Sequence, residues 1–106
     1  MVEELAKAAG DLPIVLGGDF NTTEKSRGYY TYRYLVGPAG YKDARYAAPE
    51  NATDNSGTAR IWGKDLNNNG SRIDYIFVND KCKVCGTHVP NIGVSDHLPV
   101  VADLEI

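Results

Sequence analysis

A short apolar run bounded by chain-turning residues places the strongest constraint on the fold. Pro13 introduces residues 14–16, which are Ile, Val and Leu, and two glycines end the run. A run that is this short and apolar throughout is typical of a strand buried on both faces of a sheet. The polar residues Asp19 and Asn21 follow almost directly. The pattern therefore predicts a buried strand with polar side chains at its C-terminal end.

Helical patterns flank this strand. Residues 2–9 carry apolar side chains at helical spacing, and Gly10 is expected to cap that helix. A tyrosine-rich helix is expected over residues 26–36, ended by Gly37 and Pro38. We expect its tyrosines to be half-buried packing residues in preference to substrate-stacking ones.

The second half of the chain reads mainly as strands. Residues 41–70 are polar and predict mostly loop with a short strand over 58–62, whereas strands are expected over 72–78, 84–89 and 98–106. The order of helix, strand, helix and then several strands is typical of the α+β class. With 106 residues, the chain can form one core but not two packed sheets with helices on both sides.

Charge and hydropathy exclude some classes of function. The formal net charge of −3 argues against a broad basic surface for nucleic acid, although an acidic protein can bind phosphate where a divalent metal neutralises it. No apolar run is long enough to span a membrane, and the first residues lack the pattern of a signal peptide. If the natural chain begins upstream of Met1, any export signal lies there, so the sequence leaves the localisation open.

Two further motifs admit more than one interpretation. Cys82 and Cys85 could belong to a zinc site with His88, form a redox dithiol or disulfide, or be ordinary strand and turn residues, which we favour because a zinc site needs a fourth ligand. Residues 65–70 imitate the start of a calcium-binding loop, but Ile76 stands where a bidentate glutamate is needed. An Asn-Gly turn leading into the next strand is therefore favoured over a calcium site.

Asp19 and Asn21 form the first candidate chemical pair. In an extended chain both side chains point to one side, while Phe20 between them anchors in the core. A carboxylate there could accept a proton from water or hold a metal, and the amide could donate to a phosphoryl oxygen. The alternative is an Asp/Asn turn that caps the strand and the following helix.

His97 and Asp74 form the second candidate pair. His97 stands just before the last expected strand, and Asp74 lies between Ile73 and Tyr75 in an apolar strand, where an unpaired carboxylate would be costly. A carboxylate bonded to one imidazole nitrogen fixes the tautomer and leaves the other nitrogen for a phosphate. The pattern favours a pairing of these two side chains.

Three motifs together resemble the endonuclease/exonuclease/phosphatase, or DNase I-like, family. They are Ile14-Val15-Leu16-Gly17-Gly18-Asp19-Phe20-Asn21, Arg72-Ile73-Asp74-Tyr75-Ile76-Phe77-Val78 and Ser95-Asp96-His97-Leu98-Pro99-Val100. The fold implied is a four-layer α/β/β/α sandwich. The chain resembles only its C-terminal half, which implies one mostly antiparallel sheet with helices on one face.

The resemblance assigns roles to five residues. Asp19 resembles the aspartate that activates or orients the attacking water and contacts the metal, and Asn21 the asparagine that contacts phosphate. Asp74 resembles the partner of the catalytic histidine, here His97, and Asp96 the carboxylate near the metal. The activity implied is hydrolysis of a phosphodiester or phosphomonoester with Mg²⁺ or Mn²⁺, the substrate being a nucleic acid, a lipid head group or a small phosphoester.

Half of the family's pattern has no counterpart in this chain. The family's first half supplies an asparagine and a glutamate for the principal metal, and no glutamate of this chain stands in such a strand context. We expect that the chain is a piece of a longer enzyme or that it forms a homodimer which mimics the missing half. In either case the face of the sheet that the missing half would cover should be open and apolar. The candidate residues of this face are Ile14, Leu16, Ile73, Phe77, Val100, Ala102 and Leu104. The alternative function is a catalytically incompetent half-domain that acts as a binding or assembly module.

Overall fold

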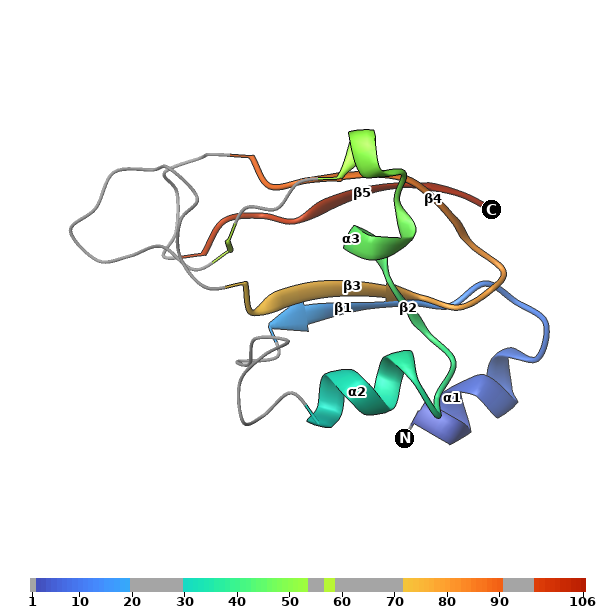
Figure 1. Ribbon diagram of the computed structural model, residues 1–106. Helices are drawn as coiled ribbons and strands as arrows, with labels where there is room; N and C mark the ends of the chain where they lie inside the picture. The colour runs from blue at the N-terminus through green and yellow to red at the C-terminus, as the bar shows by residue number, and fades with distance from the viewer. Residues whose placement is uncertain (1, 20–29, 54–56, 59–71, 91–96) are drawn as a thin grey trace.

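The structure of the chain is a computed structural model (Figure 1), and it describes residues 2–19, 30–53, 57–58, 72–90 and 97–106. These residues form nine elements: α1 (Val2–Ala9), β1 (Val15–Asp19), α2 (Tyr30–Val36), β2 (Lys42–Asp43), α3 (Ala44–Ala47), a 3-10 helix (Glu50–Ala52), β3 (Asp74–Val78), β4 (Lys83–His88) and β5 (Val101–Glu105).

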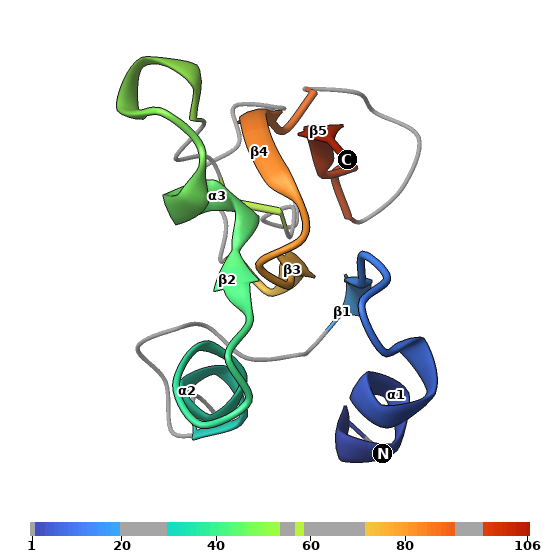
Figure 2. The same ribbon diagram turned by 90° about the vertical axis from the view of Figure 1, so that its right-hand side faces the viewer.

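The elements are arranged in three layers. Strands β1, β3 and β2 form an antiparallel sheet in that order, and β4 pairs with β5 in an antiparallel hairpin. Helices α1 and α2 lie on one side of the three-stranded sheet and the hairpin lies on the other, as Figures 1 and 2 show. The expected α+β class and antiparallel pairing are confirmed.

The described strands form two sheets, whereas a single sheet was expected. The chain passes from β3 to β4 through a tight turn in which the amide of Cys82 donates to the carbonyl of Asn79. Strand β4 then packs across the sheet and pairs with β5, with an irregularity between Val84 and Gly86. The hairpin therefore forms a second, two-stranded β layer.

Strand β3 is buried on both of its faces. Tyr75 and Phe77 point to one core with Ile14, Leu35 and Tyr41, on the side of the helices. Val78 belongs to a second core with Ala44, Ala48, Cys82 and Val84, against which Ile76, Ala102 and Leu104 pack. Because side chains alternate along a strand, β3 joins the two cores.

The open apolar face expected from the sequence is not found among the described residues. Ile14 and Phe77 are buried, and the other five residues expected on that face are partly buried: Leu16, Ile73, Val100, Ala102 and Leu104. The helices cover one face of the sheet and the hairpin covers part of the other. This burial removes the reason for expecting a homodimer through that face, and the dimer itself stays a prediction.

Strand β1 differs from its expectation in one respect. It begins at Val15, and Val15 is 48% exposed, so the strand is not buried on both faces. Ile14 and Leu16 contact the core under the helices, while Val15 points to the opposite face at the edge of the sheet. The apolar run indicated a strand correctly but overstated its burial.

The helices agree with the sequence, while the segment after them holds elements that were not expected. Helix α1 has the predicted bounds, and Gly10 follows it with φ +60°. Helix α2 begins at Tyr30 and ends before Gly37, and residues 26–29 lie outside the described residues.

Strand β2, helix α3 and the 3-10 helix interrupt the expected loop. Of the expected strand over 58–62 only Thr58 is described, in a bend, and residues 65–70 lie outside the described residues.

The two cysteines occupy different environments. Both are free: Cys82 is buried near the carbonyl oxygen of Ile14, whereas Cys85 is exposed on β4. This favours ordinary structural cysteines over a disulfide. In the described part of the chain, no three residues of the His, Cys, Asp and Glu types gather in a way that could hold a metal. No helix there is long and apolar enough to cross a bilayer.

Candidate active site

The centre of the candidate site is the contact between His97 and Asp74. Atom Nδ1 of His97 lies 2.8 Å from Oδ2 of Asp74. The side chain of His97 is 34% exposed and that of Asp74 is 19% exposed. The pair is thus held in the protein but remains open to solvent on the side of the histidine. The contact expected from the sequence is present.

Strand geometry explains how these two residues meet. Asp74 is the first residue of β3 and has the same parity as Ile76 and Val78, which pack toward the hairpin. His97 precedes Leu98, which is buried, and the chain continues into β5 of that hairpin. The alternation of β3 therefore directs Asp74 to the side from which His97 approaches.

The other three predicted site residues are placed only in part. The backbone of Asp19 lies opposite that of Asp74 in the pairing of β1 with β3. The backbone of Asp19 therefore lies at the same end of the sheet as Asp74. The side chain of Asp19, and Asn21 and Asp96 as a whole, lie outside the described residues.

A buried ion pair supports the start of β3. Atom Nη2 of Arg72 donates to both carboxylate oxygens of Asp43, and the side chains are only 12% and 2% exposed. The guanidinium also lies over the ring of Tyr75, 4.5 Å from its centroid. Asp43 in addition caps α3 by accepting from the amide of Arg45. The pair therefore ties β2 and α3 to the residues just before Asp74.

The tyrosine of α2 that faces the sheet is a packing residue. Tyr32 contacts Tyr75 and Phe77 with ring centroids 5.6 and 5.8 Å apart, and its hydroxyl donates to Asp43 at 2.8 Å. Packing was the favoured interpretation of this tyrosine. Tyr29, which shares the sequence pattern, lies outside the described residues.

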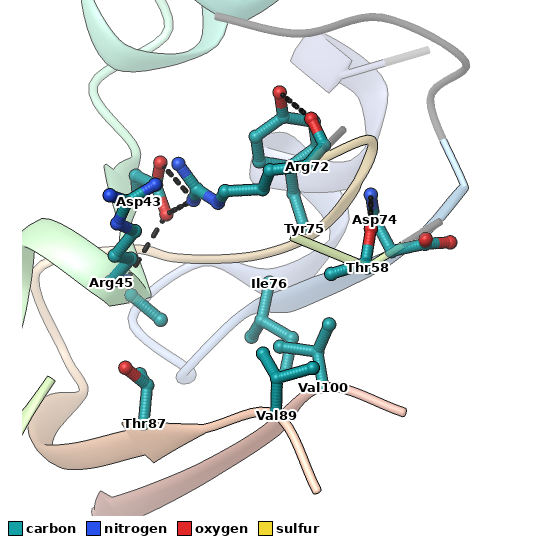
Figure 3. Close-up of a pocket in the computed structure, with 11 residues that line it drawn as sticks. Asp43, Arg45, Thr58, Arg72, Asp74, Tyr75, Ile76, Thr87, Val89 and Val100 are labelled. Carbon is teal, nitrogen blue, oxygen red and sulfur yellow. Dashed lines mark hydrogen bonds and ion pairs between the residues drawn. The ribbon is translucent and has the colours of Figure 1, made fainter. Parts of the chain in front are cut away.

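Thr58 forms hydrogen bonds with the backbone at or next to both members of the His97–Asp74 pair. Its hydroxyl oxygen accepts from the amides of Ile73 and Asp74 at 3.0 and 3.1 Å, and its carbonyl accepts from the amide of Leu98 at 2.6 Å. Thr58 is 1% exposed. Figure 3 shows Thr58 beside Asp74.

The space enclosed beside these residues is too small for a substrate. A cavity of about 20 Å³ is lined by residues that include Asp74 of β3, Thr87 of β4 and three residues outside the strands, Thr58, Arg72 and Val100 (Figure 3). This volume suits about one water molecule. This cavity, which His97 does not line, is therefore not a binding site for a phosphoester.

Sequence reasoning missed the supporting residues, although one of them had a signal. Asp43 stands between Tyr41 and Ala44, and a carboxylate among core residues requires a partner. Arg72 belongs to one of the three family motifs, but the sequence assigned it no role. Thr58 had no signal in the sequence, because a threonine in a polar stretch is ordinary.

Known proteins resemble this chain in both sequence and structure. The sequence model of the Endonuclease/Exonuclease/phosphatase family matches residues 2–97. A mannosyl-6-phosphatase of Bacteroides thetaiotaomicron superposes with a TM-score of 0.78 at 26% identity, over 98% of this chain and 42% of that one. No curated protein sequence matches the chain.

Two further solved structures show the same partial coverage. A family protein of Bacteroides thetaiotaomicron has a TM-score of 0.76 at 29% identity, over 97% of this chain and 41% of that one. One of Leptotrichia buccalis has a TM-score of 0.72 at 28% identity, over 98% and 40%. The chain spans about two fifths of these relatives, as the half-domain resemblance implied, and it belongs to the endonuclease/exonuclease/phosphatase family.

Proposed function

We propose that this chain carries the histidine half of a metal-dependent phosphoesterase active site. The observation that supports the proposal most directly is the 2.8 Å contact between His97 and Asp74 at the end of the sheet where β1 places the backbone of Asp19. Family membership supports the reaction class, because the family includes phosphatases as well as nucleases. In the proposed reaction, water attacks the phosphorus of an ester, the bond from phosphorus to the alcohol oxygen breaks, and the alcohol leaves with a proton.

In this proposal His97 contacts the phosphoryl group. Its Nδ1 atom is engaged by Asp74 and its side chain is partly exposed, so we assign the contact with the phosphoryl group to Nε2. A carboxylate behind an imidazole fixes the ring and stabilises the protonated form. His97 can then donate from Nε2 to an oxygen on which negative charge develops in the transition state.

Asp19 and Asn21 are the proposed partners of the attacking water and of the phosphate. A carboxylate can orient the water and accept its proton, and an amide can donate to a phosphoryl oxygen. The register that sets the backbone of Asp19 opposite Asp74 supports this part of the proposal. This pairing sets the end of β1, which carries the proposed water-activating residue Asp19, beside the start of β3, which carries Asp74.

The proposed metal is Mg²⁺ or Mn²⁺. Carboxylate oxygens are the ligands that these hard cations prefer, and Asp96 and Asp19 are the residues proposed to hold the ion. The donor types fit, although the described residues alone contain no group of three possible ligands. A bound ion would supply positive charge beside the phosphoryl oxygens.

A sugar phosphate is the substrate to test first. The similar structure described as a mannosyl-6-phosphatase is 26% identical to this chain, and it favours a phosphomonoester on a sugar over the nucleic acids and lipid head groups that the family also includes. The net charge of −3 agrees with a small substrate, since a long nucleic acid is usually bound by a basic surface.

The decisive experiment uses the chain together with the additional residues that turnover is proposed to need. With Mg²⁺ or Mn²⁺ present, it measures phosphate release from mannose 6-phosphate and p-nitrophenol release from p-nitrophenyl phosphate and bis(p-nitrophenyl) phosphate. We expect His97→Ala to lower kcat by at least about 100-fold, as for loss of a general acid or charge stabiliser. The matched control is His88→Ala, since His88 is exposed on β4 and should leave kcat unchanged. Turnover that survives His97→Ala would remove the role assigned to this residue.

A second proposal concerns what the 106 residues do by themselves. Because the chain spans only about two fifths of its solved relatives, we propose that turnover needs additional residues, from the same polypeptide or from a second copy. Without them the chain would act as a binding or assembly module. Turnover by a monomer of these 106 residues, shown by sedimentation in the assay buffer, would contradict this proposal.

A further inference from the structure

We propose that Thr58 is a positioning residue, which fixes the geometry between Asp74 and His97 from behind the pair. Thr58 is almost inaccessible to solvent, since the residue is 1% exposed. It contacts the backbone on both sides of the pair. Because it concerns the working geometry of the site, the inference rests on the proposed function.

The hydroxyl of Thr58 sets the start of β3. A hydroxyl oxygen has two lone pairs, and here it accepts from two successive amides, those of Ile73 and Asp74, at 3.0 and 3.1 Å. Asp74 is the first residue of the strand, so its amide stands where the chain enters the sheet. Two hydrogen bonds to one buried oxygen fix the backbone that carries the carboxylate.

The carbonyl of Thr58 anchors the backbone next to His97, the other member of the pair. It accepts from the amide of Leu98 at 2.6 Å, and Leu98 is itself 3% exposed. His97 is the residue directly before this anchored position. One buried residue therefore binds both backbone segments whose side chains meet at 2.8 Å, although these segments are 23 residues apart.

The test uses the pKa of His97, followed by NMR titration, because this readout needs no enzymatic turnover. Thr58→Val keeps the shape of the side chain but removes both lone pairs, whereas Thr58→Ser keeps the hydroxyl. We expect the valine variant to lower the pKa of His97, as Asp74→Asn does, by roughly half or more of the change that Asp74→Asn causes. The serine variant should keep the wild-type value, with His88 as a reference in the same spectra.

Non-additivity separates positioning from general destabilisation. In the double variant Thr58→Val/Asp74→Asn, the valine should add nothing to the pKa change, since its effect acts through Asp74. A wild-type pKa in the folded valine variant would overturn the inference, as would an equal change in the serine variant. If the valine variant does not fold, hydrogen exchange of the wild type decides: the amides of Ile73, Asp74 and Leu98 should be strongly protected, and free exchange at these amides would overturn the inference.

The outcomes also distinguish this inference from the proposed function. If Thr58→Val leaves the pKa of His97 at its wild-type value in a protein that His97→Ala inactivates, the role of Thr58 is refuted and the phosphoesterase function stands. If Thr58→Val shifts this pKa in a protein that hydrolyses no phosphoester, the role of Thr58 stands and the proposed function is refuted.

Discussion

Asp74 and His97 are 23 residues apart in the sequence, and a 2.8 Å contact joins Oδ2 of the first to Nδ1 of the second. The contact closes across two sheets, since Asp74 begins β3 and His97 precedes β5. The intervening residues include a turn and the whole of β4. The geometry of the candidate site is thus a property of the packed layers and not of any one motif.

The first prediction concerns the charge state of His97. A carboxylate 2.8 Å away stabilises the imidazolium, so Asp74→Asn should lower the pKa of His97. NMR titration of the histidine resonances measures this, and His88, exposed on β4, is the internal reference. An unchanged pKa would mean that the two side chains do not interact in solution.

The second prediction concerns the buried ion pair. Asp43→Asn leaves the guanidinium of Arg72 without its charged partner in a site where both side chains are nearly inaccessible. Removing one member of a buried pair typically costs about 3 kcal/mol or more, so the free energy of unfolding should fall by that amount in urea titrations. Asp43 also accepts from the hydroxyl of Tyr32, which adds to the loss.

Asp103→Asn is the matched control for that variant. It makes the same chemical change on β5, where Asp103 is exposed, and should alter the free energy of unfolding by less than about 0.5 kcal/mol. If Asp43→Asn lowered the free energy of unfolding by as little as Asp103→Asn, the contact between Asp43 and Arg72 would contribute nothing to stability.

Local patterns predicted those parts of the fold that depend on neighbours in the sequence. Helix α1 and the glycine after it follow from helical spacing and a left-handed cap. The pairing of Asp74 with His97 was predictable because a carboxylate in an apolar strand needs a partner, and few candidates exist in a chain with two histidines. The first inference uses neighbours in the sequence, whereas the second uses the cost of an unpaired carboxylate, although its two partners are 23 residues apart.

The remainder depends on tertiary packing that the sequence does not state. Strand β2 has two residues and helix α3 has four, which is too short for a periodic pattern to show. Their formation follows from Asp43, which binds Arg72 and caps α3 at once. The division into two sheets was missed for a similar reason, because β4 alternates like any strand and only its packing on Val78 places it in another layer. Thr58 acts through backbone amides, which nearly every residue has.

The third prediction tests the interpretation of the two cysteines. Cys85 is exposed on β4 and Cys82 is buried, so a thiol reagent should modify one cysteine rapidly in the native protein and the second only on unfolding. Mass spectrometry after brief alkylation identifies the residue, with Cys85→Ser as the variant that should lose the rapid phase. A native protein in which neither thiol reacts and both become available after reduction would instead contain the disulfide.

The last prediction concerns the end of α1. Gly10 has φ +60°, a conformation that costs a residue with a Cβ atom about 1 kcal/mol or more. A Cβ built there meets no atom within 4 Å, so the penalty of Gly10→Ala should come from the backbone alone. Gly10→Asn should be milder, because asparagine enters the left-handed region more readily than alanine. Urea unfolding of the two variants gives the comparison, and an alanine variant as stable as the wild type would mean that α1 ends differently in solution. Because Ala9 packs against the core under β3, a loosened end of α1 should expose that core first, which hydrogen exchange at Phe77 would detect.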